Sequence, residues 1–206
     1  MTALTDPSVK TVSFEEYLAM SGEDSNSEWV NGEVIEMSPI TYLHLKVAKL
    51  LMRAMDTYVE DNELGVVLYE RFVMKLPDIP SAREPDILFI RQENMHRIHE
   101  TFLEGPADIV VEVVSLESRL RDRATKFYEY EQGRVPEYWL IDPDRQVAEF
   151  YFLDSRGHYS AHGLDADGYF RSPFLPGFRL NPSWLWQEPL PRSSALQALV
   201  RDNSPL

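Results

Sequence analysis

Two short segments with the composition of buried β-strands each carry one carboxylate. Asp86 opens PDILFI (85–90), and Glu112 lies among the valines of DIVVEVVS (108–115). If these strands are neighbours in a sheet, the two carboxylates can face each other with their Cβ atoms about 5 Å apart. Carboxylates this close repel unless they share a proton or a cation, and Mg²⁺ is commonly held by one or two carboxylates and several waters. The pair therefore predicts a divalent-metal site.

Each acid taken alone has a simpler structural explanation. Asp86 could cap a turn, and Glu112 could form a buried ion pair with an arginine, because an unpaired buried carboxylate is strongly destabilising. The presence of two such acids on successive strands favours a shared cation over two unrelated structural roles.

A helix is expected over 117–132, directly after the strand that carries Glu112. Its apolar stripe is predicted to consist of Leu120, Ala124, Phe127 and Tyr128. Asp122, Lys126 and Tyr130 form a second line at i, i+4 and i+8, and Lys126 lies roughly 140° from the centre of the stripe. One interpretation is an exposed Asp122–Lys126 pair worth a few tenths of a kcal/mol. The alternative is that this line faces Glu112 and brings the lysine ammonium to the metal site.

The rest of the chain alternates between helical and extended patterns. A short helix is expected over 13–20 with Ser13 as its N-cap, and a long amphipathic helix over 41–65. Asn31-Gly32 between two short alternating runs indicates a β-hairpin. Strands are expected over 65–76, 85–90, 108–115, 137–144, 147–154 and 157–164. The order predicts an α/β fold of the α+β type, in which helices flank a mixed sheet, with an N-terminal hairpin and a C-terminal antiparallel strand pair.

The composition is that of one acidic globular domain. The chain has 206 residues and a net charge of −14, and it has no cysteine, which excludes disulfides and thiolate metal sites. The charge disfavours a broad attraction to nucleic acid but allows a local basic patch. No apolar run approaches the ~20 residues of a membrane span, so a cytoplasmic protein without a membrane partner is expected. One domain is expected over 11–190, between tails at 1–10 and 191–206.

The ordered set of motifs resembles the PD-(D/E)XK nuclease superfamily, and more closely the Uma-two family of bacterial "putative restriction endonucleases". The motifs are EWVNGEVIEMSP, PDILFI, EVVS, RDRATKFYEY and VPEYWLIDP. The resemblance covers about residues 12 to 185, and its most specific part is GRVPEYWLIDP after EVVS. It implies a restriction endonuclease-like core.

The resemblance also implies roles for individual residues. Asp86 and Glu112 would bind the metal, together with the main-chain carbonyl of Val113. The motif lysine normally stands two residues after the second acid, where this chain has Val114. In this family the lysine has moved to the following helix, and Lys126 fits that place.

Further residues are implied around this centre. An additional upstream acid would be either Glu28 or Glu33, and the sequence does not distinguish them. Residues expected to support the site are His44, Ser115, Asp122 and Tyr130.

The implied function is hydrolysis of nucleic-acid phosphodiester bonds with Mg²⁺ or Mn²⁺ as cofactor. The ion would activate a water and neutralise charge on the scissile phosphate, while Lys126 would orient that water or stabilise the transition state. DNA is the expected substrate, through a local patch formed by Arg83, Arg91, Arg119, Arg121, Arg123 and Arg134. The alternative is a catalytically degenerate nuclease fold that serves as a binding or regulatory module, which the valine at 114 supports. A homodimer is a further hypothesis.

Overall fold

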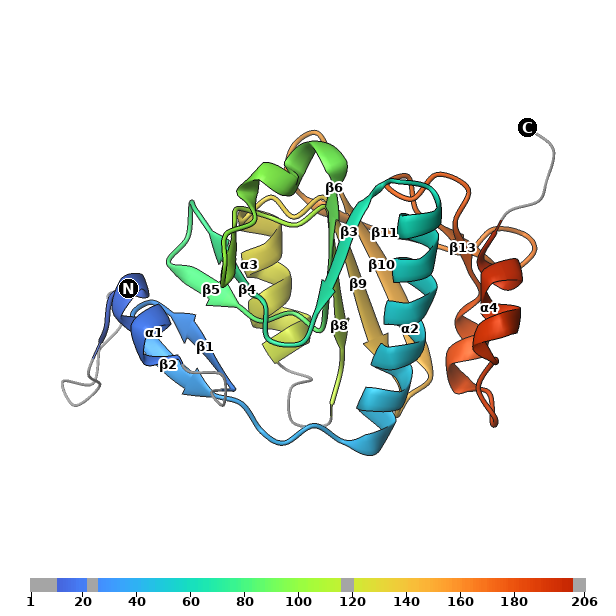
Figure 1. Ribbon diagram of the computed structural model, residues 1–206, viewed down its shortest axis with the longest axis horizontal. Coiled ribbons are helices and arrows are strands. Elements are labelled where there is room, and N and C mark those ends of the chain that lie inside the picture. Colours follow the sequence, from blue (N-terminus) through green and yellow to red (C-terminus); the bar gives the residue numbers. More distant parts are fainter. Residues whose placement is uncertain (1–10, 22–25, 116–120, 202–206) are drawn as a thin grey trace.

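The computed structural model describes residues 11–21, 26–115 and 121–201. Its centre is a six-stranded sheet with the order β11-β10-β9-β8-β6-β3 (Figure 1). The strands are β3 (Gly65–Tyr69), β6 (Ile87–Arg91), β8 (Ile109–Val113), β9 (Glu137–Asp142), β10 (Val147–Leu153) and β11 (Tyr159–His162). β8 and β9 run parallel, whereas the other neighbouring pairs in this sheet are antiparallel. The sheet is therefore mixed, as predicted.

Helices cover both faces of this sheet. α2 (Tyr42–Asp61) lies on one face and α3 (Phe127–Gln132) on the other (Figure 1). β8 is buried on both faces because its alternate side chains enter different layers. Val111 packs on the α2 side, whereas Val110 and Glu112 point to the α3 side. The predicted strand with two buried faces is therefore confirmed.

A second sheet lies beside α3 (Figure 1). Its order is β2-β1-β5-β4-β7, with strands β1 (Ser27–Val30), β2 (Glu33–Glu36), β4 (Val73–Leu76), β5 (Ser81–Arg83) and β7 (Phe102–Glu104). The predicted hairpin joins β1 to β2, and Asn31 and Gly32 at its turn have φ angles of 51° and 86°. A two-residue hairpin turn of type I′ requires positive φ angles at both of its central residues. α1 (Phe14–Met20) begins after the predicted N-cap Ser13, whose capping box with Glu16 is complete.

The segment predicted as one strand over 65–76 is instead two strands in different sheets. Glu70 and Arg71 have left-handed φ angles of 54° and 56°, which end β3 and direct the chain to β4. Neither residue is a glycine, so the sequence carries no local signal for this break. The predicted polar connection over 91–107 also contains a 3₁₀ helix, Gln92–Arg97, and the short strand β7.

The C-terminal part of the chain packs beside α2. Its elements are β12 (Phe170–Arg171), β13 (Arg179–Leu180), a 3₁₀ helix (Pro182–Trp186) and α4 (Ser193–Val200). Part of the predicted tail at 191–206 is therefore a helix, α4, which lies beside α2 (Figure 1). Its Leu196 and Val200 are buried in the same core as α2. The predicted tail at 1–10 lies outside the described residues. None of the described helices is long and apolar enough to cross a bilayer.

The helix after β8 buries a different face from the one predicted. A π-helical segment, Arg121–Lys126, leads into α3. The predicted apolar stripe is wrong at Ala124, which is exposed, and at Tyr128, which is 62% exposed. Phe127 of that stripe does pack against the core, and Leu120 lies outside the described residues. Lys126 and Tyr130, on the second line, are 2% and 0% exposed. This line packs inward because carboxylates in the interior neutralise the lysine.

A buried carboxyl group in β9 is expected to make stability depend on pH. Burial raises the pKa of Glu137 from 4.5 to about 8, against the effect of hydrogen bonds that it accepts from Ser172 and Trp139. Between these values the unfolded chain has lost the proton and the folded protein keeps it, so the free energy of unfolding should fall as the pH rises. Glu137→Gln, which stays neutral, should reduce this slope in urea unfolding curves. The exposed Glu100→Gln is the control, and equal slopes in all three proteins would contradict the prediction.

Candidate active site

Asp86 and Glu112 lie opposite each other at one end of the central sheet. β6 and β8 are antiparallel neighbours in which Ile87 pairs with Val111. The next pair of positions along this register is Asp86, just before β6, and Glu112 on β8. The two strands are therefore neighbours in the register that allows the carboxylates to face each other.

The Asp86 carboxylate is held from two sides. Its Oδ2 accepts a hydrogen bond from the main-chain N–H of Val113 at 2.6 Å, and its Oδ1 lies 2.9 Å from His44 Nε2. His44 stands in the first turn of α2, where Thr41 caps the helix by accepting a hydrogen bond from the His44 N–H at 3.2 Å. The cap therefore fixes the helix start that brings the imidazole to Asp86.

The ammonium group of Lys126 lies between two carboxylates. Its Nζ is 2.9 Å from Glu112 Oε1 and 2.9 Å from Glu28 Oε1. The Tyr130 hydroxyl donates a hydrogen bond to Glu112 Oε1 at 2.6 Å, and burial beside Glu112 raises the pKa of Tyr130 well above its ordinary value. Lys126 and Tyr130 are one helical turn apart and so reach the same carboxylate. The side chain of Asp122, on the same line, lies outside the described residues.

A buried ion network continues from Lys126 into the second sheet. Glu28 on β1 accepts a hydrogen bond from Arg83 Nη1 on β5 at 2.6 Å. Arg83 also donates from Nε and Nη2 to the two oxygens of Glu129 on α3, both at 2.7 Å. Burial acts to raise the pKa of Glu28, but the charges of Lys126 and Arg83 outweigh it and lower the pKa to about 2. Glu28 is therefore ionised at neutral pH and anchors the lysine.

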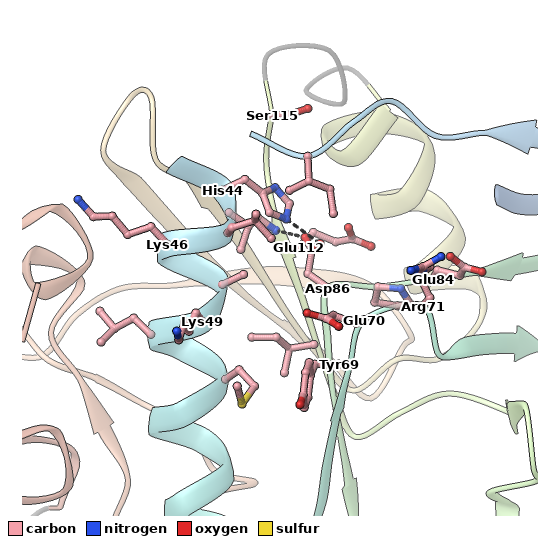
Figure 2. A pocket seen from close by; sticks show the side chains of 18 of the residues that line it. His44, Lys46, Lys49, Tyr69, Glu70, Arg71, Glu84, Asp86, Glu112 and Ser115 are labelled. Atoms are coloured by element: carbon pink, nitrogen blue, oxygen red, sulfur yellow. Dashed lines mark hydrogen bonds and ion pairs between the residues drawn. The ribbon is translucent and has the colours of Figure 1, made fainter. Parts of the chain in front are cut away.

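A pocket of about 1250 Å³ opens onto the two acids. Figure 2 shows His44, Asp86 and Glu112 gathered together, with Lys49 on α2 and Tyr69 at the end of β3 on either side of the pocket. The side chain of Asp86 is 21% exposed, so a ligand in the pocket can reach it. The site therefore combines a rigid buried support with an open approach.

Glu84 also lines this pocket, two residues before Asp86. Burial, together with the charge of Glu28, raises the pKa of Glu84 to about 7. One of its oxygens accepts a long hydrogen bond from Tyr17 at 3.4 Å, and the other is buried without a hydrogen-bond partner among the described residues. Sequence analysis did not single out Glu84. The one feature of the sequence that could have identified it is its position directly before the Pro85-Asp86 element.

Only one of the two candidate upstream acids reaches the site. Glu33 is an exposed residue of β2 and does not line the pocket, so it is not part of the site. Glu28 reaches it through Lys126, but its two oxygens face Lys126 and Arg83. This position suits a residue that orients the lysine better than a metal ligand. Ser115 lines the pocket just beyond the end of β8.

Sequence analysis missed the buried ion pair of Arg83 and Glu129, which is a structural part of the site. Arg83 was expected in a local basic patch, whereas its side chain is 1% exposed and pairs with Glu129. The partners are 46 residues apart in the chain, and Ser81 donates a further hydrogen bond to Glu129 at 2.8 Å. A local pattern cannot identify such a pair, because its members meet only when the second sheet packs on α3.

Other arginines expected on the basic patch are also held in ion pairs. Arg91 Nε lies 2.8 Å from Asp108 Oδ1, and Arg123 pairs with Glu149. The side chains of Arg119 and Arg121, which were also expected in this patch, lie outside the described part of the structure. The cationic lysines and arginines that do line the pocket are Lys46, Lys49, Arg53, Arg71 and Lys126.

The donor set formed by Asp86 and Glu112 fits a hard divalent cation. Two carboxylates from neighbouring strands are oriented toward one pocket. Within the described part of the chain, no group of three or more histidine, aspartate and glutamate side chains is arranged to hold a metal ion alone. Mg²⁺ usually binds one or two carboxylates and completes its shell with waters and substrate phosphates, so two acids suffice. The main-chain carbonyl of Val113 remains a predicted additional ligand.

The chain is similar to a known family and to a solved structure. The sequence profile of the family Uma2, described as "Putative restriction endonuclease", matches residues 14–183. A crystal structure of "a putative nuclease belonging to DUF820" from Anabaena variabilis ATCC 29413 has a TM-score of 0.71 and 16% identity, over 85% of this chain and 97% of that chain. No curated protein matches the chain. The predicted restriction endonuclease-like fold is thereby confirmed.

Proposed function

Because the chain belongs to the Uma2 family, whose description is "Putative restriction endonuclease", we propose that it is a metal-dependent nuclease that hydrolyses phosphodiester bonds. The observation that carries this proposal is the meeting of Asp86, Glu112 and Lys126 at one pocket. Two carboxylates can hold a divalent ion, and a nearby ammonium can stabilise negative charge that develops on a phosphate.

Asp86 and Glu112 would hold Mg²⁺ or Mn²⁺. When bound, such an ion lowers the pKa of a bound water and neutralises charge on the scissile phosphate. His44 and the Val113 N–H orient the Asp86 carboxylate, and the Tyr130 hydroxyl orients that of Glu112. Both acids are thus positioned before a ligand arrives, which is what a precise site requires.

Lys126 would supply the positive charge that the PD-(D/E)XK motif normally takes from a lysine on the strand itself. Its Nζ is 2.9 Å from Glu112 Oε1, so it would lie beside a phosphate bound at the two acids. From there it would orient the attacking water or stabilise charge on the phosphate oxygens. Glu28 and Arg83 act through Lys126 and are positioning residues.

One observation favours a second function, that of a binding module without catalysis. Val114, at the place of the usual motif lysine, is 1% exposed and packs in the core on the α3 side. Lys126 is in turn drawn toward the carboxylates of Glu112 and Glu28, which would weaken its hold on a substrate. A nuclease fold of this kind would bind a metal or nucleic acid without cutting it.

A cleavage assay with metal removal separates the two functions. Supercoiled DNA, linear duplex, single-stranded DNA and RNA are each incubated with the protein in Mg²⁺, in Mn²⁺ and in EDTA. We expect cleavage of at least one substrate with metal, its loss in EDTA and its recovery when metal is restored. Cleavage in EDTA would contradict the proposed chemistry. Calorimetric Mn²⁺ binding without cleavage of any substrate would favour the binding module.

A further inference from the structure

One face of α2 presents a line of polar side chains to the pocket. Tyr42, Lys46, Lys49 and Arg53 all line it, at spacings of i, i+4, i+7 and i+11. At 3.6 residues per turn, they fall within a stripe about 60° wide and about 16 Å long. Lys49 and Arg53 are exposed and form no ion pair with another described residue, whereas Lys46 pairs with Glu188. The stripe therefore offers positive charge to a ligand that carries several anionic groups in a row.

The opposite wall of the pocket offers an aromatic ring. Tyr69 at the end of β3 is 47% exposed, and Figure 2 shows it across the pocket from Lys49. The left-handed φ angles of Glu70 and Arg71 hold the next two residues at the same rim. An exposed tyrosine can stack on any base, and a carboxylate such as that of Glu70 can accept hydrogen bonds from base amino groups. This wall suits bases better than phosphates.

The overall charge of the chain and the pairing of several arginines disfavour binding of a duplex. Duplexes are bound through many phosphate contacts over a large area, whereas this chain has a net charge of −14. Arg83, Arg91 and Arg123, which were expected to provide such contacts, are each paired with carboxylates. The cations of the α2 stripe are instead collected along one concave pocket. A groove that combines cations with aromatic side chains is typical of single-strand recognition.

We therefore propose that this pocket binds a single-stranded segment of nucleic acid. Its phosphates would lie along the α2 stripe near Lys49 and Arg53, and its bases would lie against Tyr69. The segment would lead one phosphodiester to Asp86 and Glu112. This inference rests on the proposed nuclease function and specifies its substrate as an unpaired strand.

Fluorescence anisotropy in EDTA tests the preference without cleavage. The probes are labelled oligo(dT) and oligo(rU) of about 12 nucleotides and a DNA duplex of the same length. We expect at least one single strand to bind about 10-fold more tightly than the duplex, and the two single-stranded probes distinguish DNA from RNA. Tighter binding of the duplex, or no binding of either single strand, would overturn the proposal.

Substitutions in the pocket connect this binding to the site. The double variant Lys49→Gln with Arg53→Gln should weaken single-strand binding about 10-fold, and Tyr69→Ala should do so by a similar factor. Arg156→Gln and Tyr128→Ala replace exposed residues outside the pocket and serve as matched controls. Equal losses in pocket and control variants would show that the strand binds elsewhere.

The two proposals fail in distinguishable ways. Metal-dependent cleavage by a protein that prefers duplex would overturn the single-strand assignment and leave the nuclease function intact. Single-strand binding that depends on Tyr69, without cleavage in any metal, would support the pocket assignment and remove the nuclease function.

Discussion

Asp86→Asn is expected to lower metal-dependent cleavage by more than about 100-fold, which exceeds the 10- to 100-fold loss typical of residues that only support a ligand. Asparagine has nearly the same size, and its amide oxygen can still accept the hydrogen bond from the Val113 N–H. The substitution therefore removes the negative charge while it keeps the shape of the site. Glu112 would then be the only carboxylate of the pair left to hold the ion.

Cleavage rates and Mn²⁺ affinity by calorimetry are the two measurements for this variant. Both should fall, whereas the urea unfolding midpoint should stay close to that of the unchanged protein. Asp78→Asn removes the same charge from an exposed turn outside the pocket and is the matched control. Full cleavage by Asp86→Asn would show that this carboxylate does not hold the metal.

Arg83→Met is expected to destabilise the fold by about 3–5 kcal/mol, the usual cost of removing one partner from a buried ion pair. Arg83 is 1% exposed and makes hydrogen bonds to both Glu28 and Glu129. Methionine fills part of the volume but leaves both carboxylates without their shared cation. Glu28 would then face Lys126 alone, so the position of the lysine should also become less well defined.

Urea unfolding measures this loss, and a second substitution tests its cause. Adding Glu129→Gln to Arg83→Met should recover part of the stability, because one of the unpaired charges is then gone. Arg156→Met, in an exposed pair with Asp154, should change the free energy of unfolding by no more than about 0.5 kcal/mol. A loss in Arg83→Met as small as this would show that the buried network does not stabilise the fold.

Short-range periodicity was enough to predict how the central acids are placed and which residues share a helical line with Lys126, but not whether that line is buried. Alternation along β8 put Glu112 on the same face as Val110, and both point to the α3 side. The four-residue spacing of Lys126 and Tyr130 put them on one line, and both contact Glu112. These placements depend only on local geometry and on which strands are neighbours.

Long-range packing explains what the sequence did not reveal. Lys126 resembled a solvent-exposed lysine because Glu28, which neutralises it, stands almost 100 residues earlier in the chain. The same reason hid the pairing of Arg83 with Glu129. The end of β3 after Tyr69 was not predicted, because Glu70 adopts a left-handed conformation. A sequence seldom indicates this conformation unless the residue is a glycine or an asparagine.

The buried ion network also bears on the charge of the metal ion that is proposed for this site. At their ordinary charges, the three carboxylates of the network carry −3 and its two cations carry +2, so one negative charge remains. The carboxylates are Glu28, Glu112 and Glu129, and the cations are Lys126 and Arg83. Asp86 adds a second negative charge, so a divalent ion would make the network and Asp86 together electrically neutral. A monovalent ion would leave a charge in a low-dielectric interior, and a trivalent ion would introduce one of opposite sign. Discrimination by valence would therefore be set by residues that never touch the ion.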